Sequence, residues 1–85
     1  MTALRRLTPR YVTTSTPLSA AHRLALRNLI AARGMAGAAR ALGAGVATLD
    51  TLVAEGGKAV DATARRIAAR LDELALLERI EEVLP

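Results

Sequence analysis

Gly34, Gly43 and the pair at positions 56 and 57 bound two short segments in the middle of the chain. Each segment is long enough for about two turns of helix. Between Gly34 and Gly57 the sequence reads GMAGAARALGAGVATLDTLVAEGG. Gly43 falls between the two segments, and glycine readily adopts the left-handed conformation that ends a helix and begins a tight turn. The spacing therefore predicts two short helices, at residues 35–42 and 46–54, joined by a glycine turn.

The apolar residues favour helices throughout the chain. Most of them are alanine or leucine, and Tyr11 is the only aromatic residue. Alanine and leucine are strong helix formers, whereas strands are enriched in β-branched and aromatic residues. We therefore expect an all-α domain of four to five helices, with an extended arm at the N-terminus.

Start and stop signals extend this interpretation to the whole chain. Thr16 and Pro17 mark the start of a first helix that Gly34 ends, because proline fits the first helical position. Asp61 is a candidate cap for a long last helix that reaches nearly to Leu84. The predicted segments are a basic extended arm with a possible short strand at residues 10–14, a helix-turn-helix core, and a long C-terminal helix for dimerisation (residues 1–16, 17–59 and 60–85).

A helix-turn-helix unit places its second helix in the major groove of DNA. The stretch GAGVATLDTLVAEG resembles the turn and recognition helix of the λ-repressor-like superfamily, which includes the phage Cro type and the lac-repressor type of headpiece. VDATARRIAARL is similar to the helix that follows in that family, so the resemblance covers about residues 35–74. The family has a small residue in the middle of the first helix, a glycine in the turn, and bulky apolar residues where the two helices meet. These positions are occupied here by Ala39, by Gly43, and by Leu42, Leu49 and Leu52.

The resemblance implies that the outer positions of residues 45–54 face DNA. The candidate contact residues in this segment are Gly45, Val46, Ala47, Thr48, Asp50 and Thr51. None is Arg, Lys, Asn or Gln, so bidentate recognition of guanine or adenine is excluded here. The base contacts that remain possible are methyl contacts to thymine and a hydrogen bond that Asp50 accepts from cytosine. The alternative that this helix no longer reads bases stays open.

Positive charge is concentrated in the first half of the sequence. Residues 1–49 contain seven arginines and no acidic residue, whereas residues 50–85 contain five basic and eight acidic residues. Arginines on an extended arm can enter a narrow minor groove, and basic residues near helix ends can contact phosphates. The candidates are Arg5, Arg6 and Arg10 in the arm, and Arg33, Arg40 and Lys58 around the two short helices. Codon bias is the alternative explanation of the uneven charge. Ordinary solvated surface is the alternative role of Arg33, Arg40 and Lys58.

The last helix carries more apolar residues than one core-facing stripe needs. Val60, Ala64, Ile67, Leu71 and Leu74 form such a stripe at helical spacing. The candidate dimer contacts overlap its end and continue beyond it: Leu74, Leu76, Leu77, Ile80, Val83 and Leu84. Arginines near the start and glutamates near the end favour antiparallel pairing in a homodimer, centred near Leu74. The alternative is that this end folds back on the first helix.

Other chemistry has little support in the sequence. The chain has no cysteine, and its one histidine, His22, has no cysteine or carboxylate beside it, so we expect a solvated helix residue there and no metal site. We predict no enzyme activity, no cofactor and no small-molecule ligand. Arginines interrupt every apolar run, which argues against a membrane span. A cytoplasmic, nucleoid-associated location in a bacterium or phage is the expected setting.

The sequence therefore predicts a double-stranded DNA-binding protein, selective for sequence or for DNA shape. A small dimeric transcriptional regulator of the phage or mobile-element repressor type fits these features. The alternative function is a helical module for protein–protein interaction or oligomerisation that keeps the helix-turn-helix packing without binding DNA.

Overall fold

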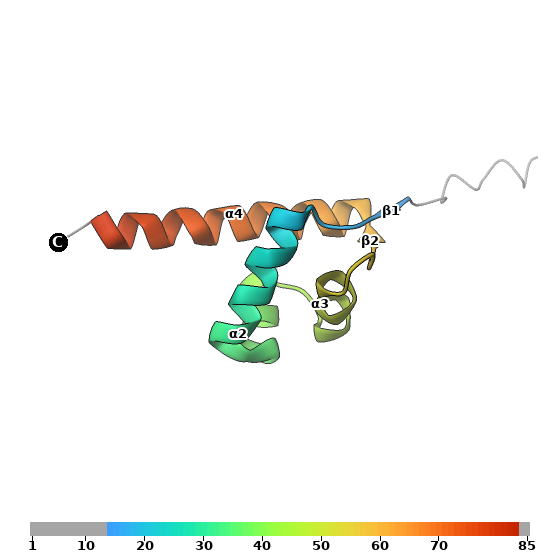
Figure 1. Cartoon of the computed structure of the whole chain (residues 1–85), viewed down its shortest axis with the longest axis horizontal. Coiled ribbons are helices and arrows are strands. Elements are labelled where there is room, and N and C mark those ends of the chain that lie inside the picture. Colours follow the sequence, from blue (N-terminus) through green and yellow to red (C-terminus); the bar gives the residue numbers. More distant parts are fainter. Residues whose placement is uncertain (1–13, 84–85) are drawn as a thin grey trace, which may run out of the picture.

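The computed structural model describes residues 14–83, which form three helices and one short two-stranded sheet (Figure 1). In chain order the elements are β1 (Ser15–Thr16), α2 (Ala20–Leu42), α3 (Val46–Val53), β2 (Ala59–Val60) and α4 (Asp61–Val83). The prediction of a predominantly helical fold is confirmed. None of the three described helices is both long and apolar enough to cross a membrane.

Helix α2 is kinked at Gly34, the position where the sequence predicted the end of a helix. Gly34 has φ 78° and ψ 164°, which is not helical, yet helix continues directly on both sides of it. A single residue with a positive φ, which glycine adopts readily, therefore bends α2 without inserting a loop. Residues 14–83 contain three helices and not the predicted four to five, because the two helical segments flanking Gly34 follow one another without a loop and form one kinked element.

The start of α2 also differs from the prediction. The helix begins at Ala20 and not at Pro17, because Ser19 is the N-cap residue and its Oγ accepts a hydrogen bond from the amide of His22 at 3.1 Å. Thr16 belongs to β1, which pairs antiparallel with β2 in the register Ser15 with Val60 and Thr16 with Ala59. The strand predicted at residues 10–14 falls mostly outside the described residues, and Thr14 itself is not in a strand.

Substitution of Ser19 by alanine is expected to destabilise the protein by about 1 kcal/mol, because the side-chain acceptor at the start of α2 is lost. The free energy of unfolding from urea titrations measures this change. Ser15→Ala is the matched control, since Ser15 is also exposed and no described hydrogen bond uses its hydroxyl, so a loss below about 0.5 kcal/mol is expected. Equal losses in the two variants would contradict a capping role for Ser19.

The hydrophobic core lies where all three helices meet. Leu26 lies before the bend in α2, and Ala38 and Leu42 lie after it, yet all three belong to one buried cluster. The bend therefore brings both halves of α2 against the rest of the core. The full set of buried apolar residues is Leu18, Leu26, Ala38, Leu42, Leu49, Leu52, Ala64, Ile67 and Leu71.

Helix α4 contributes to this core only along its first half. Leu74 is half-buried against the core, and every described residue after it is exposed. Figure 1 shows the last turns of α4 projecting beyond α2 and α3. The large apolar residues from Leu76 to Val83 are therefore exposed in the single chain, whereas Ala75 and Glu78 border a hollow that they share with the first half of α2.

Candidate functional site

The turn between α2 and α3 has the geometry that the glycine pattern predicts. Gly43 adopts a left-handed conformation, with φ 65° and ψ 37°, and follows the last residue of α2. Its amide donates to the carbonyl of Arg40, and the amide of Ala44 donates to the carbonyl of Ala39 at 3.0 Å. These bonds satisfy carbonyls that the end of a helix leaves without partners. The prediction that Gly43 is the left-handed turn residue is confirmed.

A side chain from α4 holds the same turn from outside. The Nε of Arg70 donates to the carbonyl oxygen of Ala41 at 3.0 Å, in a partly buried position. Another nitrogen of the same guanidinium lies 3.4 Å from a carboxylate oxygen of Glu73. The sequence pattern places the arginines at the start of this helix in helix pairing and does not indicate this contact of Arg70, because nothing local links residues 29 positions apart. The contact fixes α4 against the last turn of α2.

Helix α3 has a buried face and an exposed face. Leu49 and Leu52 are fully buried against the core, which α2 also lines with Ala38 and Leu42. On the other side, the exposed residues of α3 are Val46, Ala47, Asp50 and Thr51. The helix ends at Val53, one residue before the predicted end. Packing through two leucines thus leaves the candidate contact residues of α3 accessible, except Thr48, which is half-buried.

The structure gathers four predicted contact residues around one open hollow beside α3: Ala47, Thr48, Thr51 and Lys58. Ser15 and Thr63, which the sequence analysis did not select, also line this hollow. They reach it because β1 pairs with β2 immediately before α4 begins. No local sequence signal marks either residue, since their place depends on strand pairing across more than forty positions.

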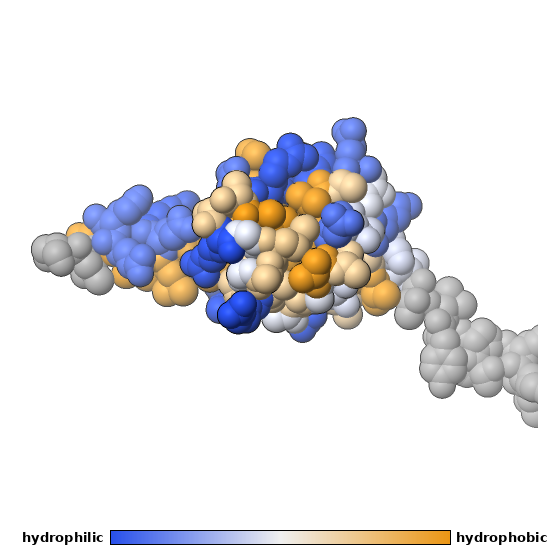
Figure 2. All heavy atoms as spheres, turned by 90° about the horizontal axis from the view of Figure 1, so that it is seen from below, coloured by the Kyte–Doolittle hydropathy of each residue, from blue (hydrophilic) through white to orange (hydrophobic). Residues whose placement is uncertain are grey.

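A second hollow lies where α2 meets the start of α3. Arg40, Gly43 and Val46 line it, together with three alanines. Arg33 lies in a neighbouring hollow on α2 that also includes Arg40. The two predicted contact residues of α2, Arg33 and Arg40, therefore line one hollow, while Lys58 lines the hollow beside α3. Figure 2 shows the face that carries α2 and α3, with apolar and weakly polar residues over its middle and hydrophilic residues around them.

The polar groups of α3 have limited hydrogen-bonding capacity toward a partner. The hydroxyl of Thr51 donates to the carbonyl of Ala47 at 3.1 Å, so it offers a partner only lone pairs and a methyl group. Gly45 caps α3 without a side-chain hydrogen bond, which leaves amides of the first turn open to an anion. Asp50 and Glu55 are exposed nearby and repel phosphate. This surface is suited to shape and methyl contacts more than to hydrogen bonds with bases.

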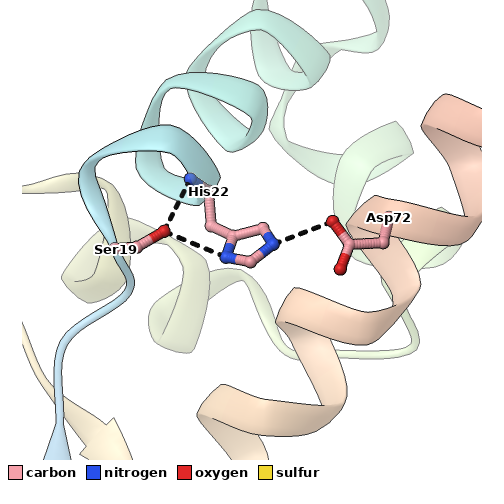
Figure 3. Close-up of polar contacts among 3 residues, drawn as sticks. All are labelled: Ser19, His22 and Asp72. Atoms are coloured by element: carbon pink, nitrogen blue, oxygen red, sulfur yellow. Dashed lines mark hydrogen bonds and ion pairs between the residues drawn. The ribbon is translucent and has the colours of Figure 1, made fainter.

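His22 differs from its prediction as a solvated helix residue. Its imidazole lies between Ser19 and Asp72, with Nδ1 3.0 Å from the Ser19 Oγ and Nε2 2.9 Å from the Asp72 Oδ1 (Figure 3). The Ser19 Oγ also accepts from the His22 amide, so it serves as a helix cap. The arrangement therefore ties the start of α2 to α4. Sequence spacing missed it, because Asp72 is 50 positions from His22.

Four of the predicted contact residues lie outside the described part of the chain: Arg5, Arg6, Arg10 and Leu84. Their proposed roles rest on sequence alone. Comparisons with protein-family models, with curated proteins and with solved structures found no match to this chain.

Proposed function

We propose that the chain is a small double-stranded DNA-binding regulator of the helix-turn-helix type. The supporting observation is the arrangement of α2, Gly43 and α3, in which α3 packs through one face and leaves the other accessible. Helix-turn-helix proteins present their recognition helix to the major groove in this way. The resemblance of residues 35–74 to λ-repressor-like proteins points to the same function.

In the proposed complex, α3 lies in the major groove and basic residues beside it contact the DNA backbone. Arg40 borders the hollow that includes Val46, and Lys58 borders the hollow that includes Ala47 and Thr51. Backbone contacts from such positions set the register of a protein on DNA. Methyl groups of α3 then contact thymine. Affinity depends mainly on charge, and sequence preference depends on groove shape.

This binding mode predicts that Arg40 and Lys58 contribute measurably to the salt dependence of DNA binding. Removal of both Arg40 and Lys58 by substitution with alanine is expected to reduce the slope of log K against log salt by about 1.8, at about 0.9 per phosphate contact. The affinity at about 0.1 M salt should fall on the order of tenfold or more. Fluorescence anisotropy of a labelled random-sequence duplex, titrated at several salt concentrations, measures both quantities.

Arg27→Ala is the matched control for lost charge, since Arg27 is an exposed arginine on the first half of α2 and lines neither hollow. This variant should lower the affinity for DNA less than loss of Arg40 or Lys58 does. Its slope of log K against log salt should stay within about half a unit of the wild-type slope. If the protein does not bind duplex DNA even at low salt, the proposed function is rejected. If Arg27→Ala weakens binding as much as the double variant, α3 is not at the centre of the interface.

A second candidate function is a helical module for protein–protein interaction. Two observations favour it: the exposed face of α3 carries no Arg, Lys, Asn or Gln, and exposed apolar residues lie along the last turns of α4. Under this function the protein self-associates but does not bind duplex DNA at any salt concentration. The same titration separates the two functions, because self-association is expected under both and duplex DNA binding under only one.

A further inference from the structure

Two opposite sides of α4 carry apolar residues. Ala64, Ile67 and Leu71 face the core and are buried. Ile80 lies nine positions beyond Leu71, which is about two and a half turns of helix, so it points to the opposite side. It belongs to a group of exposed residues that follow one another at helical spacing on that side: Leu76, Leu77, Ile80 and Val83. In Figure 2 apolar residues lie along one edge of the projecting end of α4.

The same side continues to the start of α4 with much smaller apolar residues. Ala69 and Ala62 precede Ile80 by about three and five turns, so all three lie on one line along the helix. Both alanines are exposed. We call this side, from Ala62 to Val83, the outer face of α4. Ala62 and Ala69 occupy its first half with the exposed Arg66 beside them, the exposed Glu73 lies at its middle, and large apolar residues occupy its second half.

Charge on α4 divides in the same way. Arg65, Arg66 and Arg70 lie in the first half, whereas the second half contains one arginine and five acidic residues, Asp72, Glu73, Glu78, Glu81 and Glu82. A parallel pair of such helices would set arginine against arginine and glutamate against glutamate. An antiparallel pair sets the acidic half of one helix against the basic half of the other.

We propose that the outer face of α4 pairs antiparallel with the same face of a second copy of the chain. The two-fold axis passes near Leu76, so that Leu76 of one copy meets Leu76 of the other. Val83 then packs over Ala69 of the second copy, where the small side chain leaves room for it, and Ile80 lies opposite Glu73. This interface is isologous, as expected for a two-fold symmetric dimer.

This register also pairs charges on both edges of the contact. Glu81 of each copy lies beside Arg70 of the other, and Arg79 lies beside Asp72; within its own copy Arg70 also contacts Ala41 and Glu73, and Asp72 also contacts His22. Each half of α4 thus supplies the side-chain size and the charge that the other half lacks, which is why the expected occupant of the outer face is a second copy. Leu74 packs against the core, so the interface differs from the sequence prediction by beginning its apolar contacts at Leu76. The proposal does not depend on DNA binding.

The first test measures self-association of the full chain. Sedimentation equilibrium is expected to show a dimer at tens of micromolar protein, and Leu76→Glu should raise the dissociation constant at least tenfold. Leu24→Glu is the matched control, because Leu24 is 56% exposed and Leu76 is 55% exposed, but Leu24 lies on α2. Circular dichroism checks that both variants remain folded. A monomeric wild-type protein, or a Leu76→Glu variant that still dimerises, would overturn the proposal.

The second test measures the orientation of the two helices. The chain has no cysteine, so introduced cysteines report on single contacts. Under mild oxidation, Leu76→Cys should form a disulfide-linked dimer, because its two copies meet near the axis. Val83→Cys should not, whereas the double variant Ala69→Cys/Val83→Cys should. Crosslinking of Val83→Cys alone as readily as Leu76→Cys would indicate parallel helices and overturn the antiparallel register.

Discussion

The Gly57→Ala variant is expected to lose about 3 kcal/mol or more of folding free energy, because a Cβ at this position collides with the backbone. The added atom would lie 1.7 Å from the carbonyl oxygen of Thr51 and 3.2 Å from that of Ala54. Both neighbours are main-chain atoms, so no side chain can rotate away to relieve the contact. The loop after α3 must shift, and the hydrogen bond from the Gly57 amide to the Ala54 carbonyl is strained or lost.

Thermal unfolding followed by circular dichroism measures this effect. For a domain of this size, about 1 kcal/mol corresponds to a change of about 4–8 °C in Tm, so a fall of more than about 12 °C is expected. Gly45→Ala is the matched control at the other end of α3, where an added Cβ has no atom within 4 Å and φ is −77°. It should cost less than about 1 kcal/mol. Similar losses for the two variants would contradict the steric explanation.

The elements predicted best from sequence are those whose ends depend on local signals. Gly43 ends α2 because glycine adopts the left-handed conformation without a steric penalty, and the residue type alone indicates this. The start of α4 is predicted to within one residue, because Asp61 is expected as the cap before the helix and is instead within its first turn. In the structure Asp61 is the first residue of α4, and its carboxylate accepts a hydrogen bond from the Thr14 hydroxyl at 2.8 Å.

The elements predicted poorly depend on contacts between distant residues. Proline at position 17 fits a helix start, but pairing of Thr16 with Ala59 keeps this part of the chain extended until Ser19. The contact of Arg70 with the carbonyl of Ala41 likewise joins segments with no shared local pattern. Helix propensity describes residues near one another in sequence, so it carries no information on such pairs.

The candidate site shows the same division between local and distant information. Leu49 and Leu52 are spaced for one face of a short helix, and this spacing alone predicts which residues of α3 point outward. The hollow beside α3 also contains Ser15 and Thr63, which come from β1 and α4. These two residues join the site only after the chain has folded. The exposed face of α3 was therefore predictable from sequence, whereas the full lining of the hollow was not.

Leu49→Ala is expected to cost about 2–5 kcal/mol, since the side chain is fully buried and its removal leaves a cavity in the core. Domains of about 85 residues have a total stability of about 4–13 kcal/mol, so this single change removes a large fraction of it. Urea denaturation measures the effect as a lower midpoint with an unchanged slope. Leu24→Ala is the control, because the exposed Leu24 side chain loses little when it is shortened and should cost less than about 0.5 kcal/mol.

Leu49 also determines whether α3 exists as a helix. α3 has eight residues, and isolated helices shorter than about 12–15 residues are marginal in water, so its helical structure depends on packing through Leu49 and Leu52. If α3 contacts DNA as proposed, Leu49→Ala should weaken DNA binding even at temperatures where the rest of the protein stays folded, although Leu49 itself is buried. Unchanged DNA affinity in a variant that has lost 2 kcal/mol or more would show that the DNA contacts lie outside α3.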